Sequence, residues 1–322
     1  MTGRGEAWIR RRDRWSPWEA AFWAATLLPF LLFPTYLTLA SQIAIAALFA
    51  LSLDLVLGYA GIVTLGHAMF FGIGAYAAGL LSRAGWGEPL SGLVLAAALA
   101  GLVGWIASFL VARVRRLALI MVTLGLGLLT FELANAMSWL TGGTDGLRGV
   151  DTWPLLGVFR FDLWGYTAYG YALAALVAGF LASRRIVGSS FGLALRGIRE
   201  NPRRMPAIGA DDRGHLRRIY AISAAMAGAA GALLTQTTDT VSLETLSFQR
   251  SADVVVMLIL GGAGRLYGGI LGALIFLLAR DRLAGMNPQY WYFWIGLLLM
   301  VVVLAMPRGI LGGLARLVGR RG

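Results

Sequence analysis

The sequence contains no cysteine and no lysine, and its two histidines are His67 and His215. Without cysteine the chain can form neither a disulfide nor a thiolate zinc site. A P-loop needs a lysine on the nucleotide phosphates, so this chain holds no P-loop. Two histidines are too few for a histidine-based metal cluster. We therefore expect no cofactor in this chain, and any ATP that drives it must be used by another subunit.

Charged residues are also scarce, at 14% of the chain, whereas soluble proteins carry about 25%. Hydrophobic residues make up 58%, and apolar runs close to the ~20 residues of a membrane-spanning helix recur along the whole sequence. Only helices and closed barrels satisfy their backbone polar groups in lipid. The runs lack the period-two alternation of a barrel strand, so they predict helices.

The length and interruption of the apolar runs predict an all-α, polytopic membrane bundle of about ten spans. The first run follows an arginine-rich segment but is too long for a signal peptide, so we expect an uncleaved first span. Two of the runs, 251–264 and 266–280, are short and glycine-interrupted. They are either full spans or a re-entrant hairpin, which leaves eight to ten spans. The predicted spans are 19–39, 41–57, 62–82, 90–112, 117–139, 164–183, 218–237, 251–264, 266–280 and 290–306.

All 28 basic residues are arginine, and positive charge marks cytoplasmic loops. With ten spans and a cytoplasmic N-terminus, 22 arginines fall on the inside and six on the outside. This distribution predicts that both termini are cytoplasmic. The expected organisation is a basic N-terminal segment at 1–18, a membrane domain at 19–306 with an outer loop at 140–163 and a basic cytoplasmic loop at 184–217, and a cytoplasmic tail at 307–322.

An internal repeat is indicated by residues 57–66 and 260–269, which are identical at five of ten positions with a constant offset of 203. Both segments fall at predicted turns on the cytoplasmic side, so the repeat would be parallel. Transporters are often built from repeats, with substrate sites at the repeat interface. The alternative is a chance coincidence of glycine and leucine, both of which are abundant here.

The cytoplasmic loop contains a predicted short amphipathic helix. Phe191, Leu195 and Ile198 share one face of it, and its charged residues lie off that face. Asn201 fits the N-cap, and Pro202 the first position, of a second short helix. An apolar patch with a cationic rim suits insertion into a groove on a cytosolic protein. The alternative is an interfacial helix held by anionic lipid.

Two carboxylates lie inside predicted spans, Asp54 in the second and Glu132 in the fifth. If it faced a pore, either would steer the ammonium group of a zwitterionic substrate. The alternative is a hydrogen bond between helices. His67, at the start of the third span, suits helix packing better than ligand binding, and the nearby glycines permit broken helices. The candidates for the translocation pathway are Asp54, Gly58, Gly61, His67, Glu132 and Asn135.

A set of short motifs carries a family resemblance over about Ile43 to Ile310. The motifs are GYAG at 58–61, LGHA at 65–68, GIGAY at 72–76, TGGTDG at 141–146, LRGIREN at 195–201, IG at 208–209, LGGAG at 260–264 and PRGI at 307–310. Together they resemble the permease subunit of bacterial branched-chain amino-acid ABC importers, in particular its LivM-like group. In one departure, Pro206 follows Pro202 closely and would shorten the second helix of the cytoplasmic loop.

The resemblance implies a multi-pass protein of the bacterial inner membrane that works by alternating access. It also implies a second, homologous permease subunit, two cytosolic ATPase subunits and a periplasmic binding protein as partners. The outer loop would touch the binding protein through Thr141, Gly142, Gly143, Asp145 and Gly146. The segment matched to the family's ATPase-coupling loop contains Leu195, Arg196, Ile198, Arg199, Glu200, Asn201 and Gly209.

The expected function is therefore that of a non-catalytic translocation subunit of an ABC importer for branched-chain or related amino acids. An importer of the same family for urea, an amide or an aromatic acid is one alternative, and a stand-alone secondary transporter or channel is another. An enzyme would need a nucleophile or metal cluster that the sequence does not assemble. Besides the protein subunits, we expect the lipid bilayer as a partner, and no nucleic acid.

Overall fold

The computed structural model describes residues 17–313 apart from 33, 115, 116, 163, 203, 208, 287, 307 and 308. In this part of the chain the ordered structure is helical, and β-structure is limited to two isolated bridges, Leu147 with Val241 and Leu155 with Phe159. The prediction of an all-α bundle is therefore confirmed. Nearly all of the predicted N-terminal segment 1–18, most of the tail 307–322, and Pro307 and Arg308 of the last motif lie outside the described residues.

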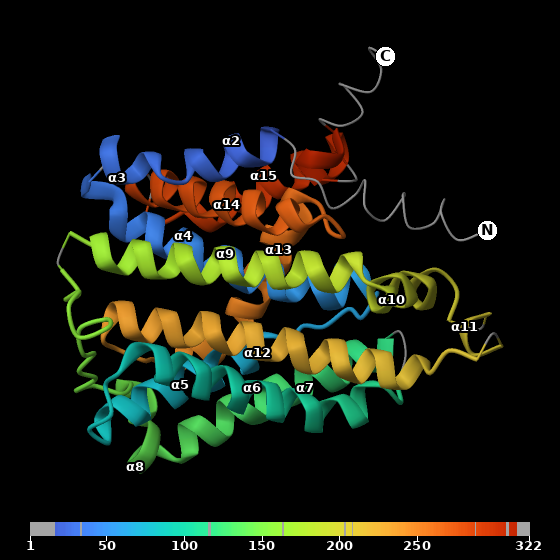
Figure 1. The fold of residues 1–322 in the computed structure, drawn as a ribbon, viewed down its shortest axis with the longest axis horizontal. Coiled ribbons are helices and arrows are strands. Elements are labelled where there is room, and N and C mark those ends of the chain that lie inside the picture. The colour runs from blue at the N-terminus through green and yellow to red at the C-terminus, as the bar shows by residue number, and fades with distance from the viewer. Residues whose placement is uncertain are drawn as a thin grey trace.

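The main helices run back and forth along one direction, joined by turns and short helices (Figure 1). In chain order the elements are α2 Pro17–Ala25, α3 Leu28–Leu32, η1 Pro34–Tyr36, α4 Leu37–Asp54, η2 Leu55–Tyr59, α5 Ala68–Arg83, α6 Pro89–Val111, α7 Leu117–Ala136, α8 Ser138–Thr141, η3 Gly143–Asp145, α9 Tyr166–Gly188, α10 Ser190–Glu200, α11 Arg204–Ala207, α12 Asp212–Thr238, η4 Leu243–Leu246, α13 Phe248–Gly261, α14 Leu266–Met286 and α15 Trp291–Ala305.

Five helical segments of the described chain are long and apolar enough to cross a membrane, or six if the bent pair α13–α14 counts as one span. The chain is thus a multi-pass membrane protein. This count by length and composition is lower than the eight to ten spans predicted from the apolar runs, because shorter helices such as α5 and α15 are not included in it. The two helices of the bent pair meet at 114°, so the predicted broken or re-entrant helices are present.

The span count differs because apolar composition does not distinguish a straight helix from a broken one. The predicted span 19–39 is two short helices, α2 and α3, separated by a turn at residues 26–27. In the predicted span 62–82 the helix begins only at Ala68, and residues 61–67 form a non-helical segment. The residues are apolar enough for lipid in both cases, but their backbone leaves the helix.

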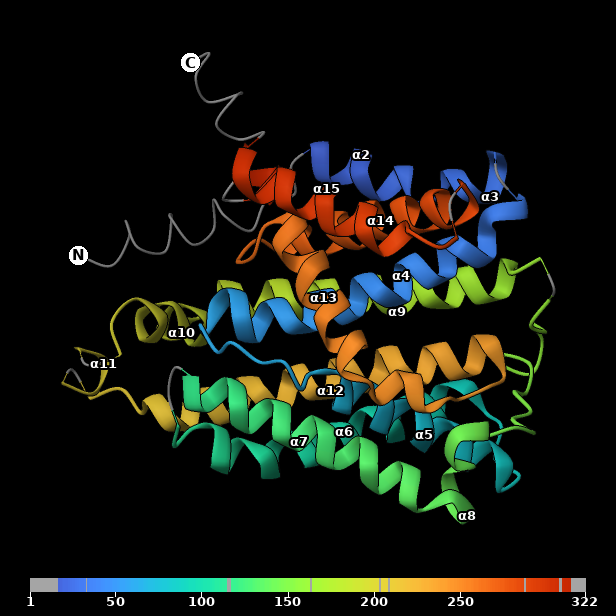
Figure 2. The same cartoon turned by 180° about the vertical axis from the view of Figure 1, so that it is seen from behind.

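Two helices, α4 and α12, form the centre of the bundle. α12 packs against α6, α5 and α4, whereas α4 also packs against α9, α14 and α13. The group α5, α6 and α7 therefore lies on one side of this centre, and α2, α3, α14 and α15 lie on the other (Figures 1 and 2). Helix α13 crosses between the two groups (Figure 2).

Small residues let the central helices approach closely. A Cβ added to Gly74 of α5 would lie 2.0 Å from the carbonyl oxygen of Gly228 in α12, and one added to Gly231 would lie 1.8 Å from the oxygen of Phe71. Membrane helices associate through such small-residue contacts, because lipid offers no hydrophobic gain on burial. Gly74, Gly228 and Gly231 therefore allow α5 to pack closely against α12.

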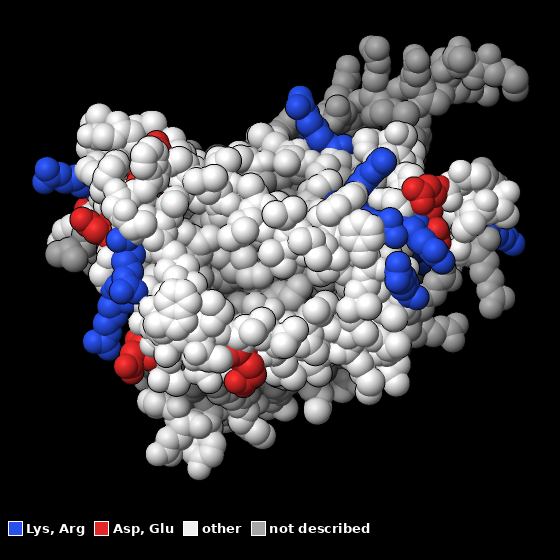
Figure 3. Space-filling model, turned by 90° about the horizontal axis from the view of Figure 1, so that it is seen from below, with Lys and Arg blue, Asp and Glu red and all other residues white. Residues whose placement is uncertain are grey.

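The outer faces of α6 and α7 carry large apolar side chains with no protein cover, among them Val94, Ile106, Met121 and Leu129. In Figure 3 the charged side chains lie mostly toward the two ends of the molecule, and uncharged side chains fill the middle. A wide apolar band between charged ends is the surface expected of a chain whose solvent is lipid.

Candidate functional site

The predicted amphipathic helix of the cytoplasmic loop is α10, at the end of the bundle where α9 finishes and α12 begins (Figure 1). Ser189 is its N-cap, and the hydroxyl of Ser189 accepts a hydrogen bond from Gly192 N at 3.4 Å. Leu195 and Ile198 are buried, and the ring of Phe191 stacks on His215 of α12 at 5.3 Å. The helix therefore packs its apolar face against the chain's own bundle.

This packing corrects one expectation. Leu195 is 0% and Ile198 4% exposed, so neither side chain belongs to an apolar patch that a partner could reach. A short helix with one apolar face is more stable when that face is covered, and here α9, α12 and η2 cover it. The outward side of α10 instead presents Leu193, Arg199 and Glu200.

Arg199 joins α10 to the C-terminal end of α4. Its Nη1 donates a hydrogen bond to the carbonyl oxygen of Gly58 in η2. Its aliphatic stem lies over Gly61, where an added Cβ would come within 2.8 Å of Arg199 Cγ. Beside it, the guanidinium of Arg196 lies 5.2 Å from the ring centre of Tyr59, a cation–π distance. Two arginines of α10 thus hold the π-helical turn that ends α4.

Asp54 joins the same end of α4 to the turn between α13 and α14. Its Oδ1 accepts a hydrogen bond from Gly264 N at 2.6 Å, although the two residues are 210 positions apart in the sequence. The side chain is fully buried. Arg199 also reaches this turn, since a Cβ added to Gly264 would lie 3.2 Å from Arg199 Nη1. We call Asp54, Gly58, Arg199 and Gly264 the Arg199 junction, because they connect α10, α4 and the α13–α14 turn.

Glycine is required at two positions of the junction for different reasons. Gly58 has no room for a side chain, since an added Cβ would lie 2.0 Å from Asp54 Oδ1 and 2.5 Å from Gly264 N. Gly264 has φ +79, a conformation that residues with a Cβ rarely adopt. The two segments of the predicted repeat, 57–66 and 260–269, therefore meet at this point. The repeat itself stays a prediction.

The remaining candidates of the cytoplasmic loop follow α10. Asn201 Oδ1 accepts a hydrogen bond from Arg204 N at 3.2 Å, as an N-cap side chain does. The second helix, α11, is a single turn that contains Pro206, in line with the predicted shortening. Gly209 follows it with φ +84. Among the described residues, α10 is therefore the only helix of more than one turn between α9 and α12.

The predicted outer loop begins with a tight glycine turn at the opposite end of the bundle. Thr141 Oγ1 donates to the carbonyl oxygen of Ala134 at 2.5 Å, and Gly142, Gly143 and Gly146 have φ 80, 57 and 72. The turn is fixed to the segment after α12, because Leu147 N donates to Val241 O at 2.7 Å. Asp145 is exposed on this turn, so its carboxylate is accessible to solvent or to another protein.

His67 lies in neither of these places but in the core. It is 1% exposed, its Nε2 is 3.0 Å from Ser52 Oγ, and its ring stacks on Phe49 at 5.5 Å. Next to it, Ala68 N donates to Ser251 Oγ at 2.9 Å. These contacts tie the start of α5 to α4 and α13, which agrees with the packing role expected for this histidine.

The six candidates for the translocation pathway therefore do not converge. Asp54, Gly58 and Gly61 lie at or beside the Arg199 junction, and His67 lies in the core. Glu132, which is exposed, and Asn135 are on the last turns of α7, at the other end of the bundle. Whether any of them contacts substrate stays a prediction.

Sequence reasoning missed the partners of the buried polar groups. Ser223 Oγ donates to the carbonyl oxygen of Ser52 at 2.5 Å, and Gly264 completes the contact of Asp54. A serine on an apolar helix resembles any other small residue in sequence, so no local signal predicts these pairs. For Gly264 the repeated glycine motif was a signal, but it did not identify Asp54 as the partner.

Comparison with known proteins places this arrangement in a family. The family model of the branched-chain amino acid transport system permease component matches residues 35–303. This match covers most of the chain, including both helices and the turn of the Arg199 junction. The chain belongs to this permease family. No solved structure gives a significant match to the chain.

Individual relatives of this permease come from two subunit types. The high-affinity branched-chain amino acid transport system permease protein LivM of Escherichia coli K12 is 28% identical, over 89% of this chain and 72% of the relative. LivH of the same strain is 26% identical, over 83% and 91%. The probable LivM of Methanocaldococcus jannaschii is 25% identical, over 81% and 89%. The permease is thus similar to both members of a LivM–LivH pair.

Proposed function

We propose that this permease is one of two membrane subunits of an ABC importer for branched-chain or related amino acids. In this proposal separate ATPase subunits hydrolyse ATP and the chain itself has no catalytic role. The substrate class is suggested by the relatives, whose names specify branched-chain amino acids. Urea, amides and aromatic acids remain alternative substrates, because a binding protein that delivers the solute would set most of the choice.

The observation that carries the proposal is the Arg199 junction. An ATPase that moves α10 has to move membrane helices if it is to drive transport. Arg199 and Arg196 connect α10 to the end of α4, and Asp54 connects α4 to the α13–α14 turn. Because α4 is at the centre of the bundle, a displacement of α10 would bias the equilibrium between inward-open and outward-open states.

The partners follow from the same arrangement. ATPase subunits would approach the end of the bundle at α10 and α11, which carries the exposed Arg199 and Glu200. A second, homologous permease would complete the pore, as the match to both LivM and LivH suggests. A periplasmic binding protein would approach the opposite end, where Asp145 is exposed. Both termini would then be cytoplasmic in a plasma membrane.

Reconstitution tests this proposal. The chain, a second permease and two ATPase subunits are placed in proteoliposomes, with the binding protein and labelled L-leucine on the opposite side from ATP. We expect uptake that requires ATP, the binding protein and both permeases. Concentrative uptake by the chain alone, driven by an ion gradient, would contradict the proposal and favour a stand-alone secondary transporter.

A further inference from the structure

A cavity of about 400 Å³ lies between the first two helices and the bundle. Its walls come from α2, α3, η1, α4, α9 and α14. The break of the first predicted span at residues 26–27 borders the cavity, since Ala25, Thr26 and Pro29 line it. The cavity is far from the Arg199 junction and has no part in the proposed coupling.

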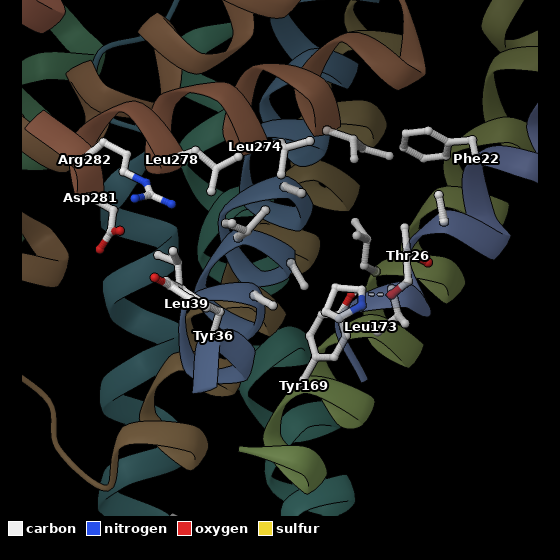
Figure 4. Close-up of a pocket in the computed structure, with 18 residues that line it drawn as sticks. Phe22, Thr26, Tyr36, Leu39, Tyr169, Leu173, Leu274, Leu278, Asp281 and Arg282 are labelled. Atoms are coloured by element: carbon white, nitrogen blue, oxygen red, sulfur yellow. Dashed lines mark hydrogen bonds between the residues drawn. The ribbon is translucent and has the colours of Figure 1, made fainter. Parts of the chain in front are cut away.

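The interior of the cavity is apolar. Apart from Thr26 and Tyr169, the side chains around its inner part are aliphatic or aromatic (Figure 4). These two residues bond within the wall, since Tyr169 Oη donates to the carbonyl oxygen of Thr26 at 2.5 Å and Thr26 Oγ1 donates to Trp23 O at 2.7 Å. An apolar cavity without hydrogen-bonding partners does not hold ordered water. A molecule that fills this interior would therefore have to present hydrocarbon to its walls.

One end of the cavity is charged. Asp281 and Arg282 of α14 lie there, and Phe22 lies at the other end (Figure 4). Both charged residues are exposed, and the half-exposed ring of Tyr36 stands beside them. This is the end of the bundle opposite α10, where α4 begins and α14 finishes (Figure 1). Aromatic and charged side chains gather at such a depth because lipid headgroups lie there.

We propose that this cavity binds a phospholipid, with one acyl chain inside and the headgroup at Asp281 and Arg282. The guanidinium of Arg282 would bind the phosphate, a geometry that arginine matches with two hydrogen bonds. The carboxylate of Asp281 would receive an ammonium group, so a zwitterionic headgroup such as phosphatidylethanolamine fits both charges.

Two other occupants fit less well. A free amino acid has the right charges for the mouth, but the apolar interior would be left empty or would have to take a zwitterion without hydrogen-bonding partners. A helix of a second permease is a rigid cylinder about 10 Å wide. A flexible acyl chain can instead follow an irregular cavity whose walls come from six different elements.

Photo-crosslinking tests the assignment. The full chain is placed in nanodiscs that contain phosphatidylethanolamine with a diazirine on its acyl chain, and the labelled peptides are identified by mass spectrometry. We expect labelling concentrated on the cavity walls in α4, α9 and α14. Arg282→Gln should reduce it about tenfold, the effect of losing one strong charged contact, and Ala40→Trp should abolish it by filling the cavity.

Matched variants control for general effects. Arg83→Gln removes an exposed arginine at the end of α5, and Ala98→Trp adds a large ring on the exposed face of α6. Neither should change labelling of the cavity. Because Arg282 is exposed, its substitution keeps the test valid even if Ala40→Trp fails to fold. Equal labelling of α6 and the cavity walls, wild-type labelling in Arg282→Gln, or displacement of the label by free L-leucine would each overturn the proposal.

Discussion

Replacing Gly58 with alanine would place a methyl group inside the contact between Asp54 and Gly264. The new Cβ would lie 2.0 Å from Asp54 Oδ1 and 2.5 Å from Gly264 N, so it cannot fit unless their hydrogen bond opens. Gly58 has a helical conformation, for which alanine is intrinsically better by about 0.5–1 kcal/mol. In the absence of the clash, the substitution would therefore stabilise the protein.

The magnitude follows from the two contacts that are lost. Overpacking of a closed site costs about 1–3 kcal/mol, and leaving a buried hydrogen-bonding group unsatisfied costs about 1–3 kcal/mol. After the helix gain is subtracted, we expect a net loss of roughly 1–5 kcal/mol. At about 2–4 °C per kcal/mol, the apparent melting temperature should fall by at least a few degrees.

Thermal stability in detergent measures this loss, by the amount of monodisperse protein that remains after heating. Gly125→Ala is the matched control, because Gly125 also lies in a helix and an added Cβ there meets nothing within 4 Å. We expect the control to equal or exceed the wild type. If Gly58→Ala were as stable as Gly125→Ala, the packing described for the Arg199 junction would be incorrect.

Three further perturbations test other parts of the structure. Burial raises the pKa of Asp239 above its usual 3.8, despite the hydrogen bond from Thr152. The folded state therefore binds a proton more tightly than the unfolded state does. The free energy of unfolding should consequently fall as the pH rises from the usual pKa to the raised one. Asp239→Asn should remove this dependence in acid melting curves, and an unchanged curve would refute the assignment. His67→Ala loses the Ser52 bond and leaves a cavity, so we expect about 2–4 kcal/mol of destabilisation in thermal melts; wild-type stability would contradict its core role. Glu132→Gln should alter the KM for a zwitterionic amino acid while expression stays normal, and unchanged uptake kinetics would reduce Glu132 to a surface residue of α7.

The long apolar runs predicted most of the helices, because helix length in lipid is set by the bilayer. The ends of α6, α9 and α12 lie within six residues of the expected ones. The non-helical segment 61–67 and the break at 26–27 were not predictable in this way. A non-helical segment and a helix can have the same apolar composition, and the difference depends on neighbours that are distant in the sequence.

The candidate site was likewise predictable only in part. The position of α10 was predictable, since an amphipathic period is a local feature. The sequence could not predict that Leu195 and Ile198 face the bundle rather than a partner. The bundle and a partner protein both attract an apolar helix face equally well. The pairing of Asp54 with Gly264 joins residues 210 positions apart. Gly58 and Gly264 signal a close approach of two backbone segments, but they do not identify Asp54 as the partner.

The central claim is that Arg199 transmits motion between the ATPase subunits and α4, and the ratio of substrate imported to ATP hydrolysed tests it most directly. In proteoliposomes with the complete transporter, Arg199→Gln would be compared with Arg213→Gln, which removes an exposed arginine near the start of α12. We predict that Arg199→Gln assembles and hydrolyses ATP but imports at least about tenfold less substrate per ATP, the effect of losing one charged hydrogen bond from the coupling, whereas Arg213→Gln keeps the wild-type ratio. A wild-type ratio in Arg199→Gln would contradict the account.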